Sequence, residues 1–201
     1  MKGQKLRLRV LCEDELHQNF VERLATRYGI GDRQRRIDAA PAARGTAAGY
    51  VLDNFVGFVD RWRSESHDAN VVALVMIDGD EKGFQHRKNE LAAKLKDAHR
   101  PALDRDPRFA ILIPCWHIET WIAWLCGHRP IDEQTRYKRD NQPGSEVGRK
   151  IKAREYSARL AVESWTAPQR DETSHVPSLA YAREELKRLG VSTRGLRHAG
   201  A

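Results

Sequence analysis

The chain has 201 residues, of which 40% are hydrophobic and 31% charged, and its mean hydropathy is −0.67. This length suits one domain, or one domain with a small appendage. No segment approaches the roughly 20 apolar residues of a transmembrane helix. The first ten residues lack the long apolar segment of a secretion signal. We therefore expect a cytoplasmic protein without membrane association, in which Cys12, Cys115 and Cys126 are reduced thiols, because they show no CxxC spacing.

The positive charge is unevenly distributed. The net charge is +7 and the pI is near 9.5. Residues 127–201 hold 15 Lys/Arg and 10 Asp/Glu, whereas residues 1–126 hold 20 and 18. A basic surface beside an acidic region suits a protein that binds a polyanion such as nucleic acid. The same charge is also compatible with an ordinary solvated surface, so charge alone does not decide the function.

Strands and helices are predicted to alternate over the first 126 residues. Apolar runs bounded by polar residues predict strands, and apolar residues at three- and four-residue steps predict helices. The expected strands begin at Leu6 and end at Glu13, and then cover Arg35–Ala39, Val71–Ile77 and Phe109–Ile113. The expected helices follow the first strand up to Tyr28, and then cover Val51–Trp62, Lys82–Ala98 and Ile118–Leu125.

This alternation predicts an α/β fold with a mostly parallel sheet and flanking helices. We expect residues 1–126 to form the catalytic α/β core. Residues 127–201 should form a basic, mainly helical extension packed on that core. In the extension, loops are expected at residues 129–144 and 167–176, with helices at Glu146–Glu163 and from Pro177 to Leu189.

Four carboxylates are predicted to lie at one edge of the sheet. Glu13 follows the first strand, Asp78 and Asp80 follow the run VVALVMI, and Glu119 follows FAILIPCWHI. Ligands of open parallel sheets bind beyond the carboxyl ends of the strands, and carboxylate oxygens suit Mg²⁺ or Mn²⁺. We therefore predict that these four acids bind Mg²⁺ or Mn²⁺. The alternative is local: Asp-Gly forms turns, and Glu13, Asp14 or Glu119 can stabilise the start of a helix.

The predicted metal site would suit phosphodiester cleavage. Two metal ions roughly 4 Å apart can stabilise the attacking and leaving oxygens, and metal-bound water then serves as the nucleophile. Lys82 is a candidate for neutralising a phosphate, and His17 and His117 are candidates for tuning the site or acting as a general acid. Phosphate-binding glycine loops, GxGxxG and HExxH are absent from the sequence. Three basic residues of the extension are candidates for contacts with the nucleic-acid backbone: Lys150, Lys152 and Arg154.

These motifs resemble the Toprim fold, which carries a glutamate after its first strand and a DxD pair after a later strand. Glu13 in VLCEDE matches the glutamate, and Asp78 and Asp80 in MIDGD match the pair. The segment IPCWHIETWIAWL is similar to small RloB-like nuclease domains, in which Glu119 would be the matching acid. The resemblance covers most of residues 6–126. It implies a metal-dependent nuclease related to the RloB-like and overcoming-lysogenization-defect groups.

We therefore expect a divalent-metal-dependent nuclease that acts on DNA or RNA, with a role in defence against mobile genetic elements suggested by the resemblance alone. A partner ATPase subunit and a homo-oligomer are further expectations. The alternative is a catalytically inactive Toprim-like module that binds nucleic acid or a partner. A third reading, a receiver-like regulatory domain, is disfavoured because no lysine follows the strand that ends at Pro114.

Overall fold

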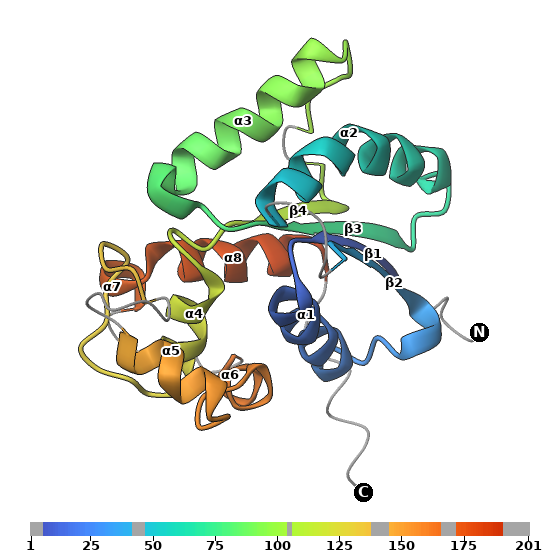
Figure 1. Ribbon diagram of the computed structural model, residues 1–201. Helices are drawn as coiled ribbons and strands as arrows, with labels where there is room; N and C mark the ends of the chain where they lie inside the picture. Colours follow the sequence, from blue (N-terminus) through green and yellow to red (C-terminus); the bar gives the residue numbers. More distant parts are fainter. Residues whose placement is uncertain (1–5, 42–46, 104–105, 138–144, 166–171, 191–201) are drawn as a thin grey trace, which may run out of the picture.

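The protein is built on a parallel sheet of four strands (Figure 1). The computed structural model describes residues 6–41, 47–103, 106–137, 145–165 and 172–190. The strands are β1 (Arg7–Cys12), β2 (Arg35–Ala39), β3 (Val71–Met76) and β4 (Phe109–Leu112), in the spatial order β2-β1-β3-β4. All three pairs are parallel, with Cys12 opposite both Ala39 and Met76. The predicted α/β fold with a parallel sheet is therefore confirmed.

Helices cover both faces of this sheet (Figure 1). One face carries α2 (Ala47–Glu65) and α3 (Gly83–Asp97), and their core residues pack with alternate residues of β3, such as Ala73 and Val75. The other face carries α1 (Glu15–Arg27), α4 (Ile118–Leu125) and α8 (Pro177–Arg188), and packs on Leu74 and Met76. Because β3 is covered on both sides, all six of its residues are buried, as its unbroken apolar run predicts.

The C-terminal helices pack on the same face of the sheet as α1. α5 (Ser145–Lys152), α6 (Ala158–Ser164) and α7 (Glu172–His175) lie with α4 and α8 on that side of the sheet (Figure 1). Trp165 is buried and packs edge-on to Phe20 of α1, at 5.7 Å between ring centroids. The described residues of 145–165 and 172–190 thus contribute to the same apolar cluster as the first half of the chain.

Two predictions for the extension were wrong. The expected single helix over Glu146–Glu163 is broken into α5 and α6, because Arg154 adopts a left-handed φ of 63° and Ser157 caps a new helix. The expected loop over residues 167–176 contains α7, although residues 166–171 lie outside the described part of the chain. The expected loop over 129–144 contains no helix or strand in its described part, residues 129–137.

Two short 3₁₀ segments, η1 (Asp32–Gln34) and η2 (Asp80–Lys82), connect the larger elements. η2 joins β3 to α3 and contains the second aspartate of the DxD pair. Within the described residues, no helix combines the length and apolarity needed to cross a membrane.

Candidate metal centre

Two of the predicted acids meet at the carboxyl ends of neighbouring strands. Glu13 directly follows β1, and Asp78 lies two residues beyond β3. Both are nearly inaccessible, with 5% and 2% exposure. The Glu13 carboxylate accepts a hydrogen bond from the backbone N–H of Asp78 at 2.7 Å. The parallel pairing of β1 with β3 therefore brings together acids that are 65 residues apart, as their positions after the strands predict.

His17 completes this cluster from the first turn of α1. One ligand atom from each of Glu13, His17 and Asp78 can be chosen so that all lie within 4.8 Å of one another. The ring is fully buried, with Nε2 at 3.0 Å from Asp78 Oδ1 and Nδ1 at 2.7 Å from Asp14 Oδ1. Asp14 is the N-cap of α1 and accepts a hydrogen bond from the backbone N–H of His17. Asp14 thus caps the helix and holds the His17 ring through a hydrogen bond, whereas the Glu13 side chain points toward Asp78.

A second histidine approaches Asp78 from α4. His117 is the N-cap residue of α4 and is 2% exposed. Its Nδ1 lies 3.2 Å from Asp78 Oδ2, while the backbone N–H of Ile118 donates to Asp78 Oδ1 at 2.9 Å. Its Nε2 is buried and has no hydrogen-bond partner among the described residues. The Asp78 carboxylate is therefore held between α1 and the start of α4.

Burial and charge shift the proton affinities of this cluster in opposite directions. Burial, followed by the charge of Asp78, raises the pKa of Glu13 to about 8. Burial alone would lower the pKa of His17, but the charge of Asp78 and hydrogen bonds with Asp14 and Asp78 raise it well above its usual value. Burial alone would raise the pKa of Asp78, but His17 and His117 hold it well below the usual range. Glu13 is therefore mostly protonated at neutral pH, and the charge of Asp78 is balanced by protonated His17.

The turn formed by Asp78, Gly79 and Asp80, here called the DxD turn, packs against the segment that follows β4. The N–H groups of Gly79 and Asp80 donate to the carbonyls of Pro114 and Trp116, at 2.8 and 3.0 Å. Gly79 lies so close to this segment that a Cβ there would stand 2.1 Å from the Cys115 carbonyl oxygen. Asp80 adopts a φ of 52°, which is uncommon for a residue with a side chain. The glycine between the aspartates is therefore required by close packing of two backbone segments.

Asp80 lies beside the buried cluster and forms an ion pair with α3. Its carboxylate is 38% exposed, and it accepts a hydrogen bond from Arg87 at 2.9 Å. Arg87 also donates to the backbone carbonyl of Asp78 at 2.9 Å and pairs with Glu90 at 2.6 Å. Arg87 is 5% exposed and turns toward the DxD turn, whereas the neighbouring Lys88 is exposed.

Glu119 and Lys82 are more exposed than the residues of the buried cluster. Glu119 is in the first turn of α4 and is partly exposed, and it does not belong to the group of close ligand atoms found among the described residues. The contribution of this turn to Asp78 is the backbone N–H of Ile118. Lys82 ends η2 and is exposed. The ligand role of Glu119 and the phosphate role of Lys82 remain predictions.

The basic candidates of the extension lie on α5 and the turn after it. Lys150 pairs with Glu146 at 2.9 Å and lies near the ring of Tyr156. Lys152 and Arg154 are exposed. α5 packs against α4, the helix that follows the cluster in sequence. Their proposed contacts with a nucleic-acid backbone remain predictions.

The two histidines contact Asp78 more closely than the sequence pattern indicates. His17 follows Glu13 by four residues, which places it one helical turn beyond the strand end, and His117 directly precedes α4. The spacing is a usable signal for His17, because Asp14 is a good N-cap and sets the first turn of the helix. No comparable pattern marks Arg87, whose position depends on how α3 packs.

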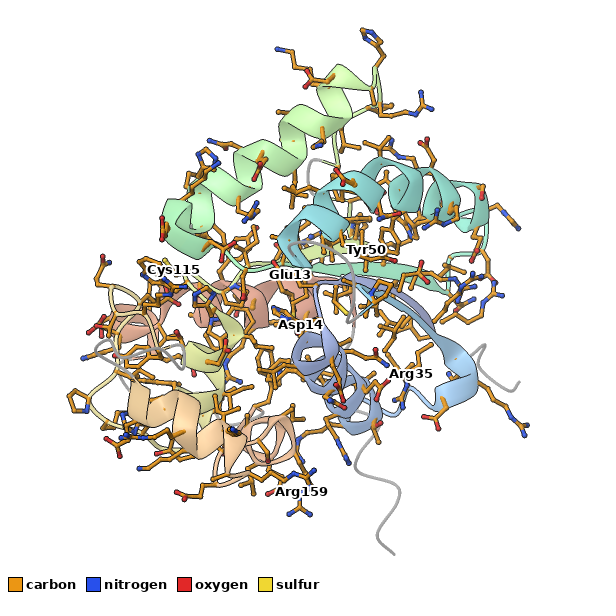
Figure 2. The ribbon with its side chains drawn as sticks, viewed as in Figure 1. Glu13, Asp14, Arg35, Tyr50, Cys115 and Arg159 are labelled. Atoms are coloured by element: carbon orange, nitrogen blue, oxygen red, sulfur yellow. The ribbon has the colours of Figure 1, made fainter. Side chains whose placement is uncertain are left out.

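Glu13 and Asp14 lie where β1 gives way to α1, and Cys115 lies on the side of the sheet where α3 begins (Figure 2). The centre is therefore assembled from the ends of β1 and β3, the first turn of α1, the N-terminus of α4 and the DxD turn. No protein-family model, curated protein or solved structure matched this chain.

Proposed function

We propose that the protein is a divalent-metal-dependent nuclease whose metal centre comprises Glu13, His17 and Asp78. The observation that carries this proposal is the convergence of three buried ligand-type side chains, with ligand atoms within 4.8 Å, at the carboxyl ends of two adjacent parallel strands. This is the place where open α/β sheets bind their ligands. The basic net charge of +7 is compatible with a polyanionic substrate.

The residues present fit a metal ion by two criteria. First, the Asp14 carboxylate holds His17 through Nδ1, which leaves Nε2 directed at Asp78. A carboxylate that orients a histidine in this way is the usual outer-shell arrangement of metal-binding histidines. Second, the two closely spaced carboxyl groups repel each other when both are ionised, and a bound cation would offset that repulsion. Because the ligand set contains one imidazole and two carboxylates, it suits Mn²⁺ better than Mg²⁺.

The protein's own side chains would divide the work at this centre. Glu13, His17 and Asp78 would hold the ion, and the carboxylate of Asp80, which is more exposed, would extend the site toward the substrate. Arg87 fixes both aspartates by bonding the Asp78 carbonyl and the Asp80 carboxylate. A divalent ion bound there would stabilise the negative charge that develops on the phosphoryl oxygens.

A second candidate function is supported by the completeness of the internal contacts. Asp78 already bonds Ile118, His17 and His117, and Asp80 already pairs with Arg87. Protonated His17 would balance the charge of Asp78, so the centre would be stable without metal. The protein would then bind nucleic acid or a partner without cleaving it, through contacts that weaken as salt rises.

The test combines metal binding with cleavage. Purified protein is titrated with Mn²⁺ and Mg²⁺ by calorimetry, and is incubated with single- and double-stranded DNA and RNA in Mn²⁺, Mg²⁺ or EDTA. The variants are Asp78→Asn and Asp80→Asn. The control is Asp53→Asn, which removes an equal charge from an exposed position on α2.

The nuclease proposal expects binding and cleavage that EDTA abolishes and that Asp78→Asn lowers by at least about a hundredfold, with little change in Asp53→Asn. Cleavage by Asp78→Asn at the wild-type rate would refute it. Salt-dependent binding of nucleic acid without turnover or metal uptake would establish the binding module instead.

A further inference from the structure

A cavity lies next to the DxD turn, and its lining does not include Glu13, His17 or Asp78. Its volume is about 350 Å³, within the range of small-ligand sites. Its walls come from the start of α3, the segment after β4, the loop at residues 132–134 and the residues around the N-terminus of α8. Phe84 in its wall follows Asp80 by four residues. Cys115 in its wall belongs to the segment that clamps Gly79.

The cavity contains a buried carboxylate, that of Glu133. This residue is 6% exposed, although it lies in a loop. The backbone N–H of Ser178 is shared between its two oxygens at 3.1 and 3.3 Å, and the Ser178 hydroxyl donates to Oε1. Trp121 in turn donates to the Ser178 hydroxyl at 2.8 Å. Because a carboxylate has about four acceptor positions, these donors leave Glu133 able to accept from a ligand.

Two aromatic side chains form another part of the wall. Phe84 and Tyr181 meet edge to face, with ring centroids 5.0 Å apart. Lys88 lies 5.2 Å from the centre of the Tyr181 ring. It lines a different pocket, between α3, β4 and α8, and does not line this cavity. An aromatic wall beside a hydrogen-bond acceptor is the usual arrangement for holding an unstacked nucleobase.

The charge of the cavity determines which part of a nucleotide could enter it. Asp132 and Glu133 both line it, and the described lining residues include no lysine or arginine. A phosphate would therefore be repelled, whereas a base with N–H donors would be attracted. Of the common bases, guanine presents two adjacent donors, N1–H and the 2-amino group, which match the two oxygens of one carboxylate. The acids at the strand ends and this cavity thus suit different parts of one nucleotide.

We propose that this cavity is a base-recognition pocket, in which Glu133 accepts hydrogen bonds from the donor edge of a guanine that stacks on one of the two aromatic rings, Phe84 or Tyr181. The inference rests on the proposed function for the statement that the ligand belongs to a nucleic acid. It adds substrate specificity: the nuclease would cleave next to an extruded or single-stranded guanine.

The test uses free nucleosides in EDTA, so that neither metal nor cleavage affects the result. Guanosine, adenosine, cytidine and uridine are titrated into the full-length protein and followed by saturation-transfer NMR and calorimetry. We expect guanosine to bind with a Kd of about 1 mM or tighter, and the other nucleosides to bind about tenfold more weakly or worse.

Glu133→Gln is the decisive variant. The glutamine carbonyl can still accept from Ser178, so the start of α8 stays intact, but an N–H₂ group replaces one acceptor. Guanosine affinity should fall by about tenfold or more. Glu184→Gln is the control, because it removes the same charge from an exposed position on α8 outside the cavity. Thermal unfolding checks that both variants are folded.

Guanosine-selective binding that Glu133→Gln removes and Glu184→Gln retains would support the proposal, even if the protein cleaves nothing. Absence of guanosine binding, or equal binding of all four nucleosides unchanged by Glu133→Gln, would overturn it. Glu133 would then act only as the cap of α8. Because the assay involves no phosphodiester, its failure would leave the proposed nuclease activity to be judged by its own test.

Discussion

Replacing Gly79 with alanine should destabilise the protein and disorganise the metal centre. The backbone at Gly79 has φ −73° and ψ −25°, a conformation that alanine adopts freely. The added Cβ, however, would stand 2.1 Å from the carbonyl oxygen of Cys115 and 2.9 Å from that of Pro114. Both neighbours are backbone atoms in a segment hydrogen-bonded to the DxD turn, so no side chain can rotate away.

The expected magnitude follows from this contact. The two segments must separate by about 1 Å, which weakens the hydrogen bonds from Gly79 and Asp80 to Pro114 and Trp116. Overpacking of this kind costs about 1–3 kcal/mol, which corresponds to a fall in Tm of roughly 2–12 °C for a chain of this size. Because Asp78 and Asp80 flank the glycine, metal affinity should fall as well.

The assay is thermal and urea unfolding in EDTA, followed by calorimetric titration with Mn²⁺. Gly57→Ala serves as the matched control. Gly57 lies on the exposed side of α2, where a Cβ would meet only the side chain of Arg61, at 3.5 Å. A glycine in a helix interior costs about 0.5–1 kcal/mol relative to alanine, so Gly57→Ala should be more stable than the wild type. The same substitution should thus have opposite signs at the two sites.

The reasoning would be refuted if Gly79→Ala were as stable as the wild type and bound Mn²⁺ with the same affinity. That result would mean that the segment after β4 yields without cost. The steric explanation for glycine between the two aspartates would then be wrong.

Three further predictions concern the buried cluster. Glu13 (pKa about 8) and His17 bind protons more tightly in the folded than in the unfolded state, so the free energy of unfolding in EDTA should fall as pH rises from about 6.5 to 8.5. The depressed pKa of Asp78 adds stability that is lost only below its ordinary value near 3.8. Urea unfolding between about pH 6.5 and 8.5 therefore measures the effect of Glu13 and His17 alone. A flat profile would contradict the assignment, and Glu13→Gln should reduce the slope. Asp14→Ala should cost about 0.5–2 kcal/mol of stability because α1 loses its N-cap, and it should weaken Mn²⁺ binding about 10–100-fold because His17 is no longer held in place. Asp14→Asn should retain most of the stability but not the Mn²⁺ affinity. Equal Mn²⁺ affinities in both variants and the wild type would show that Asp14 does not position His17. Arg87→Ala should cost about 1–3 kcal/mol, because it leaves the buried Asp78 carbonyl without its donor, whereas the Asp80 and Glu90 carboxylates remain partly solvated. An unfolding free energy unchanged in denaturant titration would show that Arg87 is not needed to position the DxD turn.

The sequence alone was sufficient for the alternation of strands and helices and for the parallel sheet. The unbroken apolar run of β3 predicts a strand covered on both faces, and the amphipathic stripes of α1 and α2 predict the helices that cover it. It was also sufficient to place Glu13 and Asp78 at one edge of the sheet, because the carboxyl ends of parallel strands point the same way. These features depend on local periodicity and on chain direction, which a single sequence contains.

Only the tertiary structure decided which side chains meet there. Glu13 and Asp14 are adjacent and chemically alike, but the start of α1 makes Asp14 the cap and turns Glu13 toward Asp78. Arg87 is indistinguishable in sequence from the exposed Lys88, and packing of α3 against the DxD turn buries it. The cavity around Glu133 requires residues from α3, the segment after β4 and α8. Such contacts join residues far apart in the chain, and their geometry is set by packing, which no local pattern encodes.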